Sequence, residues 1–193
     1  MITTILAISI IAPTAQSKYL TCAVNGEHSA NDEIATRDYN GVRWSFCCDD
    51  CLPKFDKEPA KYAELRSKDK TAAGVFLFDA ISGNRLKKDD AKGGYTDYKG
   101  VRYMFSSKEN KAKFDANMAK FGTMPKKDAL YCPVGKEEVE SYAAASGYSD
   151  YDGIRYYFCC GGCEGPFKKT PKEYIGNAKG HVGAPKIANE VVK

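Results

Sequence analysis

The residues with the most evident chemistry in this sequence are its eight cysteines, which fall into two groups of four. Each group has one leading cysteine and, after a long gap, a Cys-Cys-x-x-Cys cluster. The groups are Cys22, Cys47, Cys48 and Cys51, and Cys132, Cys159, Cys160 and Cys163. A tetrahedral thiolate site takes ligands from two separate places on a fold, and thiolates prefer soft or borderline ions. The spacing therefore favours two metal sites, each holding about one Zn or Cu(I) ion.

The same cysteines leave two other interpretations open. Disulfides persist in exported proteins, and four cysteines per group are enough for two bridges. Vicinal residues such as Cys47 and Cys48 do not easily bridge each other, so both would need partners elsewhere in the group. Cys48-x-x-Cys51 and Cys160-Gly161-Gly162-Cys163 also have the spacing of a thiol–disulfide oxidoreductase, but no thioredoxin-like alternation of strands and helices surrounds them. The spacing favours metal over both.

Composition and histidine count narrow the class of protein. The 193 residues include 29 basic and 25 acidic side chains, interspersed, with a net charge of +4. Such a mixed surface does not predict nucleic-acid binding. With His28 and His181 as the only histidines, no Cys–His hydrolase or metalloprotease pattern can be built. We therefore expect a binding protein rather than an enzyme, and assign no catalytic and no cofactor-binding residue.

The elements that must position the cysteines recur three times along the chain. Residues 39–46 (YNGVRWSF), 98–105 (YKGVRYMF) and 151–158 (YDGIRYYF) align without gaps. Two aromatic residues follow each segment at constant spacing: Phe55 and Tyr62, Phe114 and Phe121, and Phe167 and Tyr174. Such self-similarity is the mark of a repeat architecture. It predicts three modules, at 20–64, 76–123 and 130–176.

The middle module has no cysteine. In the places of the thiols it carries Asp79, Ser106, Ser107 and Asn110. Its leading segment Asp79–Gly83 matches Cys22–Gly26, whereas the third module's Cys132–Gly135 is one residue shorter. Because the aromatic residues persist where the thiols do not, we expect these aromatics to form the core. The middle module is predicted to be a degenerate copy that packs on its neighbours.

Each module has the same predicted local structure. Tyr-x-Gly is a turn signal, and the alternation of Val42, Trp44 and Phe46 indicates a half-buried strand. Residues 34–38 would supply the partner strand, and Asp49 or Asp50 would cap a helix that starts near the cysteines. A module of about 45 residues buries too little apolar surface to be stable alone, so it needs a metal, disulfides or a neighbour. The predicted class is α+β.

These patterns resemble the YHS/TRASH family of small metal-binding modules. The matching residues are Cys22, Phe46, Cys47, Cys51, Phe55, Pro59 and Tyr62, and in the third module Cys132, Phe158, Cys159, Cys163, Phe167, Pro171 and Tyr174. The resemblance implies three tandem treble-clef-like (zinc-ribbon-related) ββα modules and roles in metal trafficking, resistance or sensing. It carries over three cysteine ligands per site. Cys48 and Cys160 are proposed as the fourth ligands from spacing only, with His28 as a competitor in the first module.

The two ends of the chain complete the prediction. Residues 1–17 have a short apolar run and small residues before a cleavage point, which is typical of a signal peptide, although no Lys or Arg precedes the run. Residues 177–193 are predicted to be a flexible tail. We expect a periplasmic or secreted soluble carrier, scavenger or sensor of Zn or Cu(I), without a membrane span in the mature chain. Its partners would be metal ions and a transporter or acceptor protein; the alternative is a structural repeat or interaction protein stapled by zinc or disulfides.

Overall fold

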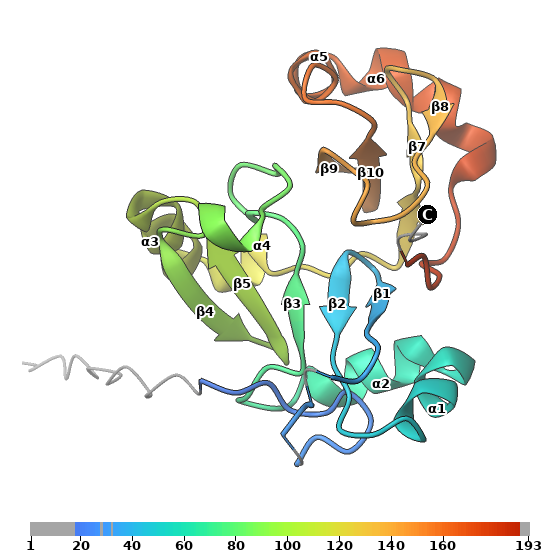
Figure 1. Cartoon of the computed structure of the whole chain (residues 1–193). Helices are drawn as coiled ribbons and strands as arrows, with labels where there is room; N and C mark the ends of the chain where they lie inside the picture. Colours follow the sequence, from blue (N-terminus) through green and yellow to red (C-terminus); the bar gives the residue numbers. More distant parts are fainter. Residues whose placement is uncertain (1–17, 28, 32, 190–193) are drawn as a thin grey trace, which may run out of the picture.

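Three β-hairpins, each followed by two short helices, form the framework of the computed structural model (Figure 1), which describes residues 18–27, 29–31 and 33–189. The first unit comprises β1 (Arg37–Tyr39), β2 (Val42–Trp44), α1 (Cys51–Lys57) and α2 (Pro59–Arg66). The middle unit comprises β4 (Gly94–Tyr98), β5 (Val101–Phe105), α3 (Lys108–Ala116) and α4 (Met118–Phe121). The third comprises β9 (Gly147–Tyr151), β10 (Ile154–Phe158), α5 (Glu164–Lys169) and α6 (Pro171–Tyr174). The predicted mixed α+β class is confirmed.

Each hairpin turns on the predicted Tyr-x-Gly sequence. The two central residues have positive φ in all three turns: Asn40 and Gly41, Lys99 and Gly100, and Asp152 and Gly153. Two successive positive φ angles match the twist of the flanking strands, which is why such turns favour Gly. At Gly100 close approach adds a second reason, since a Cβ there would lie 2.2 Å from the carbonyl oxygen of Arg66.

An Asp–Arg pair crosses each hairpin at the same register. Asp38 faces Arg43, Asp97 faces Arg102 and Asp150 faces Arg155. Each guanidinium donates two hydrogen bonds of 2.7–2.9 Å to the carboxylate opposite it. Bidentate pairs of this kind fix geometry as well as charge. They therefore hold the two strands of each hairpin in one register.

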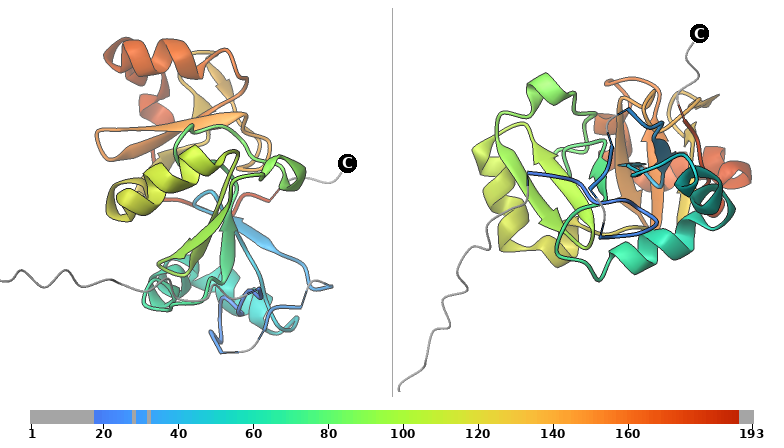
Figure 2. Two further views of the ribbon diagram at one scale, coloured as in Figure 1. Left: turned by 90° about the vertical axis from the view of Figure 1, so that its left-hand side faces the viewer. Right: turned by 60° about the horizontal axis from the view of Figure 1, so that its bottom comes forward.

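Short connecting strands join the hairpins into sheets. β3 (Gly74–Phe76) pairs antiparallel with β2 and parallel with β5, which gives a five-stranded sheet in the order β1-β2-β3-β5-β4. β6 (Lys127–Ala129) pairs parallel with β10 in a three-stranded sheet, β6-β10-β9. β7 (Tyr131–Cys132) and β8 (Glu137–Glu138) form a small ladder of their own, and η1 (Lys88–Asp90) is a single turn. In Figure 1 and the left view of Figure 2 the first unit lies below the middle one and the third above it.

The aromatic residues that recur at constant spacing contribute to the core, as predicted. Phe55, Phe114 and Phe167 are buried, whereas Tyr62, Phe121 and Tyr174 are half-buried and pack against the core. Each buried phenylalanine packs on another phenylalanine at or just after the end of its hairpin. The ring centroids are 5.3 Å apart for Phe46–Phe55, 5.2 Å for Phe105–Phe114 and 5.4 Å for Phe158–Phe167. Edge-on and tilted contacts at this distance are favourable beyond their buried area. Each pair packs a helix against its hairpin through aromatic contacts alone, in the unit without cysteines as well as in the other two.

A second aromatic cluster joins the middle of the chain to the third unit. Phe76 and Phe78 pack against Tyr148 of β9, with centroids 5.5 and 5.3 Å apart. The Arg155 guanidinium is 1% exposed and lies 5.2 Å from the Phe76 ring and 4.2 Å from the Tyr148 ring. A small unit buries too little apolar surface to be stable alone, and packing these side chains between units adds to the buried surface.

The C-terminal segment differs from the flexible tail expected from residue 177. Residues 175–181 form η2 (Ile175–His181), and the next residues cross to two strand edges. Gly183 and Asp128 exchange N–H···O bonds of 2.9 Å, while the Ala188 N–H donates to the carbonyl oxygen of Asp38. The Asn189 side-chain oxygen accepts from the N–H of Asp38 at 2.7 Å. All of these hydrogen bonds involve backbone groups, and hydrophobic periodicity in the sequence could not predict them.

Some predictions concern residues that the structure does not describe, and others it qualifies. The proposed signal peptide, residues 1–17, lies outside the described residues, as does His28. Within the described ranges, none of the helices has the length and apolar character needed to cross a bilayer. Asp50 stands at the N-cap position of α1, but its side chain makes no capping hydrogen bond.

Candidate metal centres

A tight turn carries the leading residue of each unit, which is a cysteine in the first and third units and Asp79 in the middle one. The carbonyl oxygens of Cys22, Asp79 and Cys132 accept 2.8 Å hydrogen bonds from the N–H groups of Gly26, Gly83 and Lys136, respectively. The three donor residues have φ of 74°, 86° and 59°. The third turn is therefore as long as the other two, with Lys136 in the place of glycine. The predicted one-residue shortening is wrong, because a sequence match on glycine ignored that another residue can adopt this conformation.

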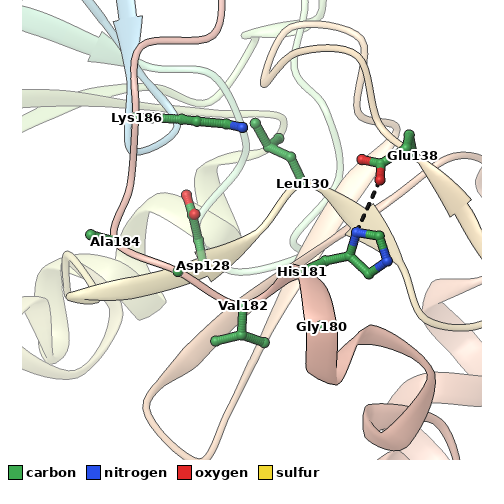
Figure 3. A pocket seen from close by; sticks show the side chains of 9 residues that line it. Asp128, Leu130, Glu138, Gly180, His181, Val182, Ala184 and Lys186 are labelled. Carbon is green, nitrogen blue, oxygen red and sulfur yellow. Dashed lines mark ion pairs between the residues drawn. The ribbon is translucent and has the colours of Figure 1, made fainter.

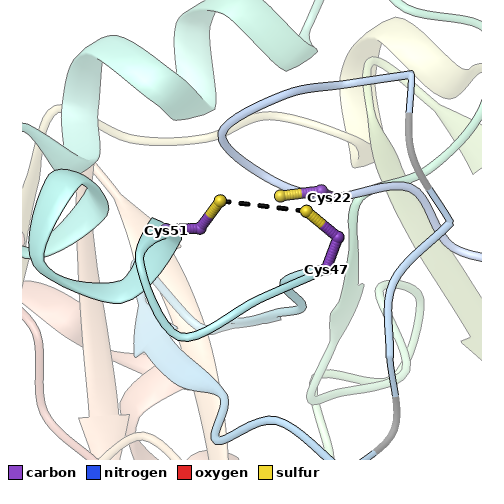
Figure 4. Close-up of side chains that lie close together, drawn as sticks. All are labelled: Cys22, Cys47 and Cys51. Carbon is purple, nitrogen blue, oxygen red and sulfur yellow. Dashed lines mark hydrogen bonds between the residues drawn. The ribbon is translucent and has the colours of Figure 1, made fainter.

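The first cluster brings together three of its four predicted ligands (Figure 4). The sulfur atoms of Cys22, Cys47 and Cys51 all lie within 4.8 Å of one another. Cys22 comes from the leading turn, Cys47 from the segment after β2, and Cys51 from the first residue of α1. Cys22 and Cys51 are buried and Cys47 is half-buried. Cys48 is not part of this triad, although its Sγ lies 3.4 Å from that of Cys51.

The third unit repeats this arrangement. Cys132, Cys159 and Cys163 form a triad with the same 4.8 Å limit. The Cys159 and Cys163 sulfurs are 3.8 Å apart, the same distance as between Cys47 and Cys51. Cys160 again stands outside, with its sulfur 3.4 Å from Cys163 and its side chain exposed. The structure thus groups six of the eight predicted cysteines into two triads and places the other two beside them.

Backbone N–H groups prepare the leading cysteine to ionise. Burial alone would raise the pKa of Cys22, but N–H donors from Asn25, Cys47 and Val24 outweigh it and the pKa is lowered. In the third unit N–H groups of Cys159 and Gly135 lower the pKa of Cys132 in the same way, against burial. The Gly135 N–H lies 3.2 Å from the Cys132 sulfur.

The other triad cysteines have raised pKa values. Burial is the main cause at Cys163, followed by a hydrogen bond to Cys160, and the pKa rises to about 12. Burial also raises the pKa of Cys51 and Cys159, and the ionised leading cysteine adds to the effect. A cation among the three sulfurs would reverse this repulsion, since metal binding deprotonates thiols. The chemistry of both triads therefore fits a thiophilic ion.

The middle unit fills the same position with hydrogen bonds. Asp79 is fully buried, and its Oδ2 accepts from the Ser106 N–H at 2.9 Å, from Ser106 Oγ at 2.6 Å and from Asn110 Nδ2 at 2.9 Å. Its Oδ1 accepts from the N–H groups of Ile81 and Ser82. Burial would raise the pKa of Asp79, but these donors lower it. Five N–H and O–H donors thus occupy this carboxylate, where the other two units have sulfur atoms.

A family comparison bears on the first unit. Residues 24–66 match the YHS domain. This YHS segment runs from the leading turn to the end of α2 and includes Cys47, Cys48 and Cys51. Cys22 lies two residues before it. No curated protein and no solved structure matches the chain. The YHS match and the two triads together support a capacity to bind metal ions.

A separate pocket of about 340 Å³ lies between the C-terminal segment and β6–β8 (Figure 3). Burial raises the pKa of Asp128 on its wall to about 6, although the Tyr142 hydroxyl donates to this carboxylate at 2.8 Å. The same hydroxyl reaches the carbonyl oxygen of Lys186, and His181 Nδ1 pairs with Glu138 at 2.9 Å. Its polar groups are thus engaged in anchoring the C-terminal segment. No cysteine lines this pocket.

Proposed function

We propose that the chain is an exported, soluble heavy-metal-binding protein that holds Zn or Cu(I) in its two cysteine triads as a carrier, scavenger or sensor. The observation that carries the proposal is the convergence of three sulfurs within 4.8 Å in each of two units. Zn(II) is held by thiolates in closed structural sites, and Cu(I) is selected by soft sulfur ligands. The lowered pKa of Cys22 and Cys132 supports the first step of such binding.

The proposal includes the architecture of the sites. We infer that the three units are copies of one YHS-like, treble-clef-like module, at 20–64, 76–123 and 130–176, and that the middle copy has lost its site. The shared order of leading turn, hairpin and helix supports this, as do the three Asp–Arg pairs. Cys48 is the proposed fourth thiol of the first site, while Cys160 or a donor other than cysteine completes the third.

A structural role is the second candidate, and the middle unit favours it. The Asp79 network ties the leading turn to the end of β5 and the start of α3, where the triads tie the equivalent elements. A zinc ion in a triad would then be a staple rather than cargo. Exchange distinguishes the two roles: cargo leaves to a competing chelator while the protein stays folded, whereas removal of a staple unfolds its unit.

The proposed binding is tested on reduced, anaerobically purified full-length chain titrated with Zn(II) or Cu(I) against a chelator. Two ions per chain are expected. Cys22→Ser and Cys132→Ser should each remove one ion, and Asp79→Asn, at the equivalent position of the middle unit, should leave both. Less than one ion per chain with fully reduced thiols would refute metal binding.

Export has its own test. Fractionation of producing cells should find the chain outside the cytoplasm, with Lys18 as its first residue. A full-length chain confined to the cytoplasm would contradict the proposed signal peptide and leave the metal proposal standing.

A further inference from the structure

The ladder β7–β8 places a carboxylate beside the third triad. Cys132 and Glu137 are direct cross-strand partners in this ladder. Side chains of directly opposed residues point to the same face of a ladder and lie close together. Cys132 is a triad member, so Glu137 stands on the face where a bound ion would lie.

The backbone at Gly135 shows how closely the carboxylate approaches the sulfurs. A Cβ built on Gly135 would lie 2.8 Å from Cys159 Sγ, 3.1 Å from Glu137 Oε1 and 3.4 Å from Cys132 Sγ. One carboxylate oxygen and two triad sulfurs thus surround the same small space, which stays open because residue 135 is glycine. The Cys159 thiol also donates a hydrogen bond to the Glu137 carboxylate.

The first cluster is built differently at this point. Asn25 stands three residues after Cys22, as Gly135 stands after Cys132. Its side-chain Nδ2 donates to Cys47 Sγ at 3.3 Å and to Cys51 Sγ at 3.8 Å. An amide N–H over the sulfurs offsets thiolate charge but gives no electron pair to a metal. The sulfurs of the first cluster therefore have the Asn25 amide as their polar neighbour, and those of the third cluster have the Glu137 carboxylate.

We propose that Glu137, rather than Cys160, is the fourth ligand of the third cluster, which makes it a three-sulfur, one-oxygen site for Zn(II) distinct from the first cluster. The inference rests on the proposed function. Zn(II) accepts Cys and Glu ligands in one tetrahedral site, whereas a carboxylate oxygen is too hard to add much for Cu(I). Glu137 and Cys160 are both exposed, and both lie outside the 4.8 Å limit that groups the three sulfurs. Glu137 is favoured because it is the cross-strand partner of Cys132 and its carboxylate borders the space between Cys132 and Cys159.

The test uses the full chain carrying Cys47→Ser and Cys51→Ser, so that only the third cluster binds, with Co(II) and Zn(II) as probes. Glu137→Gln should lower Zn(II) and Co(II) affinity by more than the roughly tenfold to hundredfold cost of losing a residue that only supports a ligand, and leave Cu(I) affinity within about twofold. Cys160→Ser should keep the sulfur-to-cobalt charge-transfer intensity of the parent. Glu138→Gln, whose residue pairs with His181 instead, is the matched control and should change nothing.

Two outcomes would overturn the inference. A normal Zn(II) affinity in Glu137→Gln excludes the carboxylate as a ligand. A loss of charge-transfer intensity in Cys160→Ser assigns the fourth position to that thiol. If the parent with only the third cluster binds neither Co(II) nor Zn(II) while its thiols are reduced, the proposed function of this cluster fails as well, so the two failures are distinguishable.

Discussion

The middle and third units solve the same structural problem with different chemistry. In the third, Cys132, Cys159 and Cys163 converge from the leading turn, the end of β10 and the residue before α5. In the middle unit Asp79, Ser106 and Asn110 come from the equivalent places and hydrogen-bond one another. The comparison teaches that the leading turn, the end of the hairpin and the start of the helix must be linked at this point of the unit. A thiol triad can link them by holding an ion, whereas the carboxylate network links them by hydrogen bonds.

Metal removal should produce the largest difference in stability between the middle unit and the other two. A ligand that binds the folded state stabilises it by about 2.7 kcal/mol at a hundredfold excess over its Kd. Chelation under reducing conditions should therefore increase amide hydrogen exchange around β2 and β10 but leave β5 as protected as before. Exchange read by mass spectrometry checks this. Equal loss of protection in all three hairpins would mean that the middle unit depends on its neighbours' metal.

Installing thiols should convert the middle unit into a third site. Asp79, Ser106 and Asn110 have the same sequence spacing as Cys132, Cys159 and Cys163. The triple variant Asp79→Cys, Ser106→Cys and Asn110→Cys should bind one additional ion per chain, counted by elemental analysis. The double variant without Asp79→Cys is the control and should not gain a tight site. A folded triple variant that still binds two ions would contradict the equivalence of the positions.

Loss of the Asp79 carboxylate should destabilise the chain. Asp79→Ala leaves the buried donors of Ser106 and Asn110 without their acceptor, and the expected cost is about 3 kcal/mol of unfolding free energy. Urea denaturation measures it. Asp89→Ala, in the exposed turn η1, is the control and should cost less than about 0.5 kcal/mol. Similar midpoints for the two variants would show that the network carries no stability.

The metal triads and the Asp79 network should be lost at different pH values on acidification. The folded pKa of Asp79 is lowered, so its contribution is complete above the unfolded value of 3.8 and disappears as the pH falls through the lower folded value. Protons compete for thiolates at higher pH, because Cys163 alone has a pKa near 12. An acid titration with a zinc indicator and tyrosine fluorescence should show ion release before the middle unit unfolds. The reverse order would contradict this account.

Sequence alone predicted those features that depend on local spacing. The grouping of the cysteines and the turns at Tyr-x-Gly follow from residues close along the chain or repeated in it. The partner of Arg155 was missed, since Asp150 becomes visible only when the register of the hairpin is known. Glu137 was missed for the same reason. The C-terminal segment pairs through backbone groups of Gly183 and Ala188, which leave no side-chain signal.

The spacing rule also had a limit within the clusters. The spacing predicts Cys48 and Cys160 as ligands because they complete Cys-x-x-Cys pairs. In the structure their sulfur atoms lie outside the triads, although each stays 3.4 Å from a triad member and that of Cys48 also lies 3.8 Å from Cys47. Three-dimensional placement was needed to separate the triads from their neighbours.

The central claim is that the first and third units hold ions and the middle unit does not. Native mass spectrometry of the reduced full-length chain, before and after chelation, measures this most directly. The account predicts a chain with two ions that loses both to the chelator while all eight thiols remain reduced. A chain that carries no ion under reducing conditions, or whose mass shows the loss of hydrogens expected for disulfides in both clusters, would contradict it.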